Sequence, residues 1–389
     1  MKKIWRVSLL ILCLLLPFSL FGRAAAAPLP TVNAATLPPP KTAAPALSAA
    51  SAILLAPQSG AVLHAHNADE RRPMASTTKI MTALVVLEHC ELDAVVTIPR
   101  EAVGVEGSSI YLFEGEQITV RDLLYGLLLS SANDAAVALA LHTAGSVPAF
   151  AALMNERAAA LSLRDTHFEN PHGLHSDGHY TTARELALIT AKALENPVFA
   201  EIVSTVRHTA KQNGTDATRL FLNHNKLLRS YKGAIGVKTG FTKASGRCLV
   251  SAAERDGLTL IAVTLNAPSD WRDHTALFDW GFSEYTVFSP TPPALTLPVV
   301  GGEVGEVTLL PASTLSVMLP ASHGEIGYIL ELPHFLYAGF AEGKTVGRIV
   351  YIENGKAIGA VELKTAVGVK KEKQRRGFFA FIYNLLHKS

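Results

Sequence analysis

Strand-like apolar runs stand at the two ends of residues 46–288, and helical patterns fill the sequence between them. The first run is residues 51–56, Ser-Ala-Ile-Leu-Leu-Ala, and the last two are residues 248–253 and 259–265. Because runs this far apart in sequence would share one sheet, their order predicts an α+β fold whose antiparallel sheet is closed by its first and last strands. Apolar residues at helical spacing predict helices in between, over residues 80–87, 123–128 and 186–194.

The pattern changes near Pro290, and short β-rich runs then alternate with Gly and Pro. Asn354-Gly355 stands between the runs 349–352 and 357–363, which is typical of a β-hairpin. We therefore predict a small all-β domain over residues 289–369, with strands near residues 295–300, 306–310, 315–319, 327–332 and 348–352.

The N-terminus has the order of a secretory signal peptide. Residues 1–26 carry four basic side chains and no acidic one, and an apolar run and small residues follow the first basic group. The apolar run is short of the roughly 20 residues that cross a bilayer, and Pro17 interrupts it, so a retained anchor is the weaker interpretation. We predict cleavage after Ala26, export to the cell wall or periplasm, and a Pro/Ala-rich linker over residues 27–45.

The C-terminus has a different composition. Residues 370–389 contain six basic groups and one acidic group, followed by a stripe of Phe, Ile and Leu at helical spacing. We predict an amphipathic helix that lies on the anionic surface of a membrane; a helix docked on the protein itself or a frayed tail is the alternative.

Charge and cysteine content exclude two classes of function. The 343 residues between the two basic ends hold 25 basic and 32 acidic groups, so their net charge is −7. An acidic body argues against nucleic-acid binding, which requires a basic face. Three cysteines are too few for a disulfide framework. Cys90 and Cys248 remain after signal cleavage, and whether they pair stays open.

The first motif with chemical meaning is Ser76-Thr77-Thr78-Lys79, at the start of the helical pattern of residues 80–87. Residues i and i+3 share a helix face, so the Ser76 hydroxyl and the Lys79 amine can come within hydrogen-bond distance. A serine is a nucleophile only when a base takes its proton, and a lysine is that base only when burial or nearby positive charge lowers its pKa. An N-cap serine beside a solvated lysine is the alternative for this motif alone.

The second motif is Ser131-Ala132-Asn133, just after the apolar run that ends at Leu129. A hydroxyl and an amide two residues apart on a turn can face one cleft, where the hydroxyl relays a proton and the amide binds a peptide group. Ser and Asn are also ordinary turn residues, so the motif alone is weak.

The third motif is Lys238-Thr239-Gly240, in a strand-like context that continues to Phe241. The ammonium and hydroxyl groups could hold a carboxylate, and Gly240 would permit a close backbone approach. An edge strand with a solvated lysine is the alternative.

Together and in this order, the three motifs resemble those of class A β-lactamases and penicillin-binding proteins, whose middle element is Ser-Asp-Asn. The chain closely resembles the low-molecular-mass penicillin-binding proteins that act as D-alanyl-D-alanine carboxypeptidases, over nearly all of the mature sequence. The resemblance implies a transpeptidase-like catalytic domain over residues 46–288, an antiparallel sheet with helices on both faces. It implies removal of the terminal D-Ala from peptidoglycan stem pentapeptides in cell-wall synthesis and remodelling, and inhibition by β-lactams. Other stretches similar to this family are residues 106–109, 131–136, 170–174 and 180–184.

The resemblance also implies roles for the motif residues. Ser76 would be the acylated nucleophile and Lys79 its base, with the Ser131 hydroxyl in the proton network and the Asn133 amide on the substrate. Water would hydrolyse the acyl-enzyme, without a metal or cofactor.

Substrate binding would involve the third motif. Lys238 and Thr239 would hold the terminal carboxylate, and beyond Gly240 the backbone N–H of Phe241 would complete an oxyanion hole with that of the serine. Some family members place an arginine upstream of this strand to help hold the carboxylate. This chain has His224 there, which leaves carboxylate recognition partly open.

Four alternatives stay open from the sequence. The motifs do not separate a carboxypeptidase from a D,D-endopeptidase or transpeptidase. A class A β-lactamase would need a deacylating glutamate, but the candidates between the second and third motifs lack the expected flanking residues. A zinc peptidase could use the polar loop of residues 172–179. A membrane-attached cell-wall-binding module would have a decayed site, against which the intact motifs speak. The glutamate candidates are Glu156, Glu169, Glu185, Glu195 and Glu201; the loop residues are His172, His175, Asp177 and His179.

Overall fold

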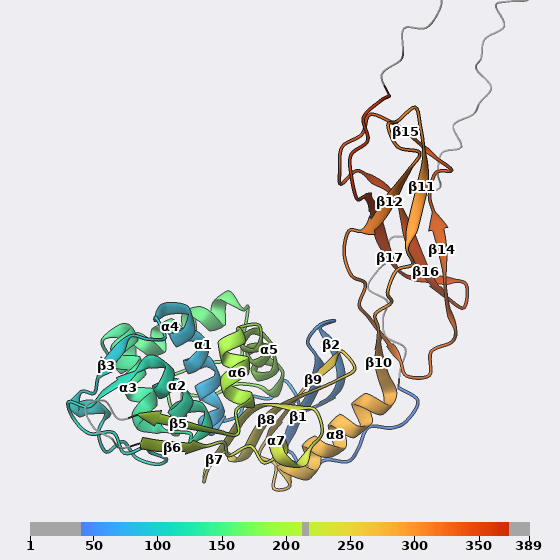
Figure 1. Cartoon of the computed structure of the whole chain (residues 1–389). Coiled ribbons are helices and arrows are strands. Elements are labelled where there is room, and N and C mark those ends of the chain that lie inside the picture. Colours follow the sequence, from blue (N-terminus) through green and yellow to red (C-terminus); the bar gives the residue numbers. More distant parts are fainter. Residues whose placement is uncertain (1–39, 212–217, 373–389) are drawn as a thin grey trace, which may run out of the picture.

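The computed structural model describes residues 40–211 and 218–372. The segments predicted as the signal peptide, most of the linker and most of the terminal helix lie outside the described residues. Figure 1 shows two parts: a domain in which helices cover a sheet, and a separate β domain joined to its long last helix.

The sheet of the first domain has five antiparallel strands in the order β2-β1-β9-β8-β7. β1 pairs with β9, with Ser51 opposite Leu265, so the predicted closure of the sheet by its first and last runs is confirmed. β7 lies at an edge of the sheet. The strands are β1 (Ser51–Ala56), β2 (Ala61–His66), β7 (Ala234–Thr242), β8 (Gly246–Arg255) and β9 (Leu258–Leu265).

Helices cover both faces of this sheet, as predicted. Ile53 and Leu55 of β1 pack into the larger core with α1 to α6, whereas Leu54 and Ala56 pack into a second core with α7 and α8. This division follows from the alternation of side chains along a strand, and it explains why β1 and β9 are buried at every position. The helices are α1 (Lys79–His89), α2 (Val120–Leu129), α3 (Asn133–Ala144), α4 (Val147–Ala160), α5 (Ala183–Leu194), α6 (Pro197–Ser204), α7 (Leu227–Ser230) and α8 (Asp270–Glu284).

Smaller elements connect these layers. The 3-10 turn η1 (Ala75–Thr78) precedes α1, and η2 (Arg100–Ala102) follows the short strand β3. Two antiparallel pairs lie outside the main sheet, namely β3 (Val95–Thr97) with β4 (Gln117–Thr119) and β5 (Arg207–Lys211) with β6 (Thr218–Leu222).

The β domain contains a six-stranded sheet in the order β14-β16-β17-β12-β11-β15. The hairpin predicted at Asn354-Gly355 is confirmed: both residues have positive φ, and Glu353 lies opposite Lys356. The strand predicted at residues 315–319 begins at Val317 and pairs with β10 instead of joining the larger sheet. The strands are β10 (Tyr285–Phe288), β11 (Leu295–Val300), β12 (Glu306–Pro311), β13 (Val317–Pro320), β14 (Ile326–Glu331), β15 (Leu336–Tyr337), β16 (Thr345–Glu353) and β17 (Lys356–Thr365).

Glu284, the last residue of α8, holds the junction between the two parts. Its carboxylate accepts from the backbone N–H of Lys41 at 2.6 Å and from the Thr42 hydroxyl at 2.5 Å, and its carbonyl accepts from Ala321 N at 2.8 Å. The incoming chain, α8 and the β domain therefore meet at one residue.

Cys90 and Cys248 are both free thiols. Within residues 40–211 and 218–372, no single helix has the length and apolar character to cross a membrane; only α3 and α4 taken together, with a bend of 83° between them, meet that test.

Candidate active site

Ser76 and Lys79 lie as close as their spacing predicts. Lys79 Nζ donates a hydrogen bond to Ser76 Oγ at 2.9 Å. The helix begins only at Lys79, and Ser76 lies in the preceding turn η1. A 3-10 turn has three residues per turn, so residues i and i+3 eclipse one another, which favours this contact.

Lys79 is completely buried among three acceptors. Besides Ser76 Oγ, its Nζ donates to Asn133 Oδ1 at 2.6 Å and to the His172 carbonyl at 2.7 Å. Burial lowers the pKa of Lys79 well below its ordinary value, and the charge of Lys238 lowers it further, although Asp134 acts in the opposite direction. The site therefore favours the neutral amine that a base requires.

Ser131 and Asn133 lie where α2 gives way to α3. Ser131 is buried, with a φ of 60°, and lines the pocket. Asn133 is the first residue of α3, and its Nδ2 donates to the Glu106 carbonyl at 2.5 Å. Both ends of this amide are thus bonded within the protein, so Asn133 positions Lys79; the substrate contact expected from the sequence stays a prediction.

The third motif lies on a strand, β7, as the sequence predicted, and this strand is at an edge of the sheet. Lys238 is almost completely buried, and its Nζ donates to the Thr239 carbonyl at 2.8 Å. Burial lowers the pKa of Lys238 to about 7. A solvated lysine on an edge strand, the alternative for this motif, does not describe Lys238.

Gly240 permits a close approach between β7 and η1. A Cβ atom at this position would lie 3.1 Å from Ser76 N and 3.2 Å from the Met74 carbonyl. Such distances are tighter than ordinary van der Waals contact, so a side chain at residue 240 would push the strand and the turn apart by a few tenths of an ångström. The partner in this approach includes the backbone N–H of Ser76.

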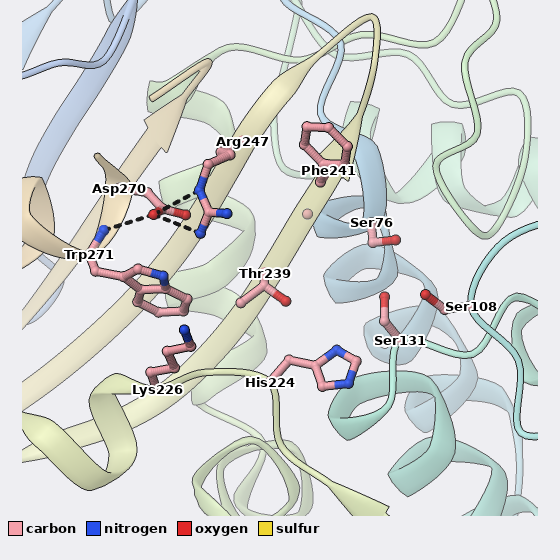
Figure 2. Close-up of a pocket in the computed structure, with 11 residues that line it drawn as sticks. Ser76, Ser108, Ser131, His224, Lys226, Thr239, Phe241, Arg247, Asp270 and Trp271 are labelled. Atoms are coloured by element: carbon pink, nitrogen blue, oxygen red, sulfur yellow. Dashed lines mark hydrogen bonds and ion pairs between the residues drawn. The ribbon is translucent and has the colours of Figure 1, made fainter. Parts of the chain in front are cut away.

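A cavity of about 360 Å³ lies at this edge of the sheet. Figure 2 shows Ser76, Ser108 and Ser131 on one side of Thr239, and Lys226, Trp271 and Arg247 on the other. The lining residues are Ser76, Ser108, Ser131, His224, Lys226, Thr239, Gly240, Phe241, Arg247, Asp270 and Trp271.

The sequence reasoning did not find Arg247, Asp270 and Trp271. Arg247 on β8 lies opposite Phe241 of β7, and its guanidinium pairs with Asp270 at 2.9 Å. Asp270 and Trp271 begin α8, a helix that the apolar spacing did not reveal. No local signal marks them, because the sheet brings them to the site.

The histidine loop supports the site and does not gather ligands for a metal. His179 Nε2 lies 2.7 Å from Thr78 Oγ1, and its Nδ1 accepts from Glu169 N at 3.0 Å. Burial lowers the pKa of His179 to about 4 and that of His172 to about 3. Among the described residues, no three His, Cys, Asp or Glu side chains are grouped as a metal site would require.

A serine hydroxyl bonded to a buried lysine, next to an edge strand that presents its backbone, defines a serine acyl-transfer site. Comparison with known proteins gives the family. The chain belongs to the D-alanyl-D-alanine carboxypeptidase family, whose sequence model matches residues 39–269. Its members are serine peptidases, and this chain is therefore a serine peptidase of the same class.

Relatives extend the likeness beyond these residues. The D-alanyl-D-alanine carboxypeptidase DacC of Escherichia coli K12 is 34% identical over 364 residues, which cover 88% of each chain. DacF of Bacillus subtilis is 28% identical over 355 residues, 88% of this chain and 90% of the relative.

Solved structures agree. Penicillin-binding protein 5 of Haemophilus influenzae has a TM-score of 0.63 at 30% identity and covers 85% of this chain and 100% of its own. The DD-transpeptidase of Streptomyces K15 has a TM-score of 0.59 at 39% identity and covers 62% of this chain and 99% of its own. The penicillin-binding-protein fold expected from the sequence is confirmed, including the β domain that follows it.

Proposed function

We propose that this protein is a serine-type D-Ala-D-Ala carboxypeptidase that removes the terminal D-Ala from peptidoglycan stem pentapeptides through an acyl-enzyme on Ser76. The observation that carries the proposal is the 2.9 Å contact between Ser76 Oγ and the buried amine of Lys79. Family membership supports the reaction class.

Acylation begins when neutral Lys79 takes the Ser76 proton and Oγ attacks the carbonyl of the penultimate D-Ala. The N–H groups of Ser76 and Phe241 bind the oxyanion, and Gly240 allows this pair to converge. The proton passes from Lys79 through the Ser131 hydroxyl to the leaving amine. Water then attacks the acyl-enzyme, with Lys79 again as the base.

Recognition of the terminal carboxylate involves Thr239 and two lysines. Lys238, with its lowered pKa, is only partly charged at neutral pH, and burial keeps His224 neutral by lowering its pKa. Arg247 is paired with Asp270. Among the pocket residues described, Lys226 is the exposed cation that no ion pair neutralises, so we assign it to the carboxylate in place of the family's arginine.

The pocket also bears on the β-lactamase alternative. None of the five candidate glutamates, all within the described residues, lines the cavity. Glu185 accepts from the backbone of Arg164 and Asp165, and Glu201 accepts from the Tyr125 hydroxyl. A β-lactam would therefore acylate Ser76 without a glutamate to promote hydrolysis of the acyl-enzyme, and the stable acyl-enzyme would be inhibited.

Export and membrane attachment complete the proposal. The mature protein acts outside the cytoplasmic membrane, attached to an anionic surface by the basic and Phe-rich segment of residues 370–389. Composition alone supports this attachment.

The test measures D-Ala release from diacetyl-Lys-D-Ala-D-Ala by the mature protein and by Ser76→Ala. Release by the wild type alone supports the proposal. No release together with labelling by a fluorescent penicillin would assign endopeptidase or transpeptidase specificity. If the wild type shows neither D-Ala release nor penicillin labelling, the protein is a non-catalytic cell-wall-binding module.

A further inference from the structure

Four exposed apolar side chains gather at the end of the β domain. Val300 and Val304 are 47% and 48% exposed, and Phe335 and Tyr337 are 42% and 71% exposed. The two aromatic rings meet edge to face, with their centroids 5.2 Å apart. We call these four residues the apolar tip.

Backbone pairing brings the segments of the tip together. Val300, at the end of β11, lies opposite Tyr337 of β15, and the Val300 carbonyl accepts from Ala338 N at 3.0 Å. Val304 lies in the turn that returns to β12, which is held by a bond from Val299 N to the Gly305 carbonyl at 2.8 Å. A contiguous exposed apolar patch marks a contact surface more strongly than scattered residues do.

The described chain ends against this same tip. Glu303 N donates to the Lys370 carbonyl at 3.3 Å, and Glu372 N donates to the Gly301 carbonyl at 3.0 Å. Gly302 lies opposite Lys371. Glu372, the last described residue at this end, therefore lies at the apolar tip, and a sequence that is basic and rich in Phe and Leu follows it.

Figure 1 shows β15 at the end of the β domain remote from α8 and from the sheet that bears the active site. A surface that held this end would keep the catalytic pocket away from itself by the length of the β domain. The location of the tip thus fits a large planar partner.

We propose that the apolar tip inserts into the interface of an anionic lipid bilayer. The proposal rests on the membrane attachment stated above and adds a folded contact to it. Tyr337 is a residue type that favours the interface, where its ring lies among lipid and its hydroxyl remains in water, and Phe335 adds apolar area beside it.

The charged side chains around the tip nearly balance one another. Lys370 and Lys371 are exposed beside it, and Glu303 and Glu372 offset their charge. The described tip is therefore close to neutral, which permits shallow insertion, and the attraction to anionic lipid comes from the basic residues that follow it.

The experiment places an environment-sensitive NBD fluorophore at Val304→Cys in the full mature chain, in a Cys90→Ser background; Cys248 is buried. The matched control carries the same probe at Ile329→Cys on β14, a position that is 54% exposed but outside the tip. Both proteins are mixed with vesicles of phosphatidylglycerol and phosphatidylcholine, some with a quencher in the acyl chains.

The expected result is a blue shift and quenching at residue 304, with no change at residue 329. Vesicle binding with neither probe changed would overturn this inference and leave attachment by the terminal segment intact. Absence of vesicle binding would overturn both. A shift at residue 304 that follows protein concentration without vesicles would assign the tip to a second copy of this chain. As a further check, Tyr337→Ser should weaken vesicle binding about tenfold and leave D-Ala release unchanged.

Discussion

Replacing Lys238 by methionine should make the protein more stable. Burial lowers the pKa of Lys238 from 10.5 to about 7. A fall of about 3.5 corresponds to roughly 5 kcal/mol by which the charged lysine destabilises the folded state at low pH. Methionine is similar in length and uncharged. Loss of the bond to the Thr239 carbonyl removes about 1 kcal/mol, so a net gain of about 4 kcal/mol is expected near pH 6.

The gain should shrink as pH rises. Above about pH 7 the folded protein releases the Lys238 proton while the unfolded chain keeps it up to about pH 10.5, so wild-type stability rises by about 1.4 kcal/mol per pH unit. The methionine variant lacks this rise, and the difference between the two should fall by roughly 3 kcal/mol from about pH 7 to about pH 9.

Guanidinium unfolding followed by tryptophan fluorescence measures this difference. Without residues 1–26 the chain has two tryptophans, Trp271 and Trp280, and both lie in α8, so the fluorescence of a protein that begins at residue 27 reports on the domain that contains Lys238. Lys243→Met, at an exposed lysine just past β7, is the matched control and should match the wild type at every pH. Parallel curves for wild type and Lys238→Met across the pH range would refute the reasoning.

The same variant has a kinetic readout. The charge of Lys238 is the second cause of the lowered pKa of Lys79. Removing that charge should raise the pKa of Lys79. The penicillin acylation rate falls at low pH when Lys79 is protonated, and this acid limb of the pH profile should therefore move to higher pH. An unmoved limb would mean that the two amines are not coupled.

Three further substitutions test the site. Gly240→Ala should slow fluorescent-penicillin acylation about ten- to a hundredfold, because its Cβ would lie 3.1 Å from Ser76 N; an unchanged rate would contradict that close approach. Lys226→Ala should raise KM about fivefold for a peptide with a free carboxylate and leave KM unchanged for the C-terminal amide; equal effects on both would remove its assigned role. Asn133→Ala should lower kcat and move the acid limb to lower pH, since Lys79 loses an acceptor that favours its charged form; a shift to higher pH would be the contrary result.

Sequence reasoning found the elements whose signal is local. Asn354-Gly355 forms a hairpin because both residues adopt positive φ readily. The α2 helix ends at Leu129 as predicted, and its spacing had revealed it. By contrast, α3 was missed because it is buried on nearly every side, so its apolar residues show no helical period.

The candidate site also contains some residues that a local sequence signal predicts and others that it does not. The i, i+3 contact of Ser76 and Lys79 follows from spacing, and so does the place of Lys238 on a strand. The role of Asn133 does not, because it depends on the carbonyl of Glu106, 27 residues earlier in the chain. Arg247 and Trp271 reach the pocket through strand pairing and helix packing, which no short motif encodes.

The geometry joins substrate binding to activation of the base. Lys79 begins α1 and Lys238 lies on β7, which approaches the preceding turn η1 closely at Gly240. The charge of Lys238 disfavours a charge on Lys79. In the proposed mechanism, a substrate carboxylate beside Thr239 favours the charged form of Lys238, and that charge in turn keeps Lys79 neutral. The burial of these two lysines destabilises the folded protein, and the same burial lets Lys79 act as a base in this mechanism. Two solvated lysines at the same spacing would keep ordinary pKa values and could not do so.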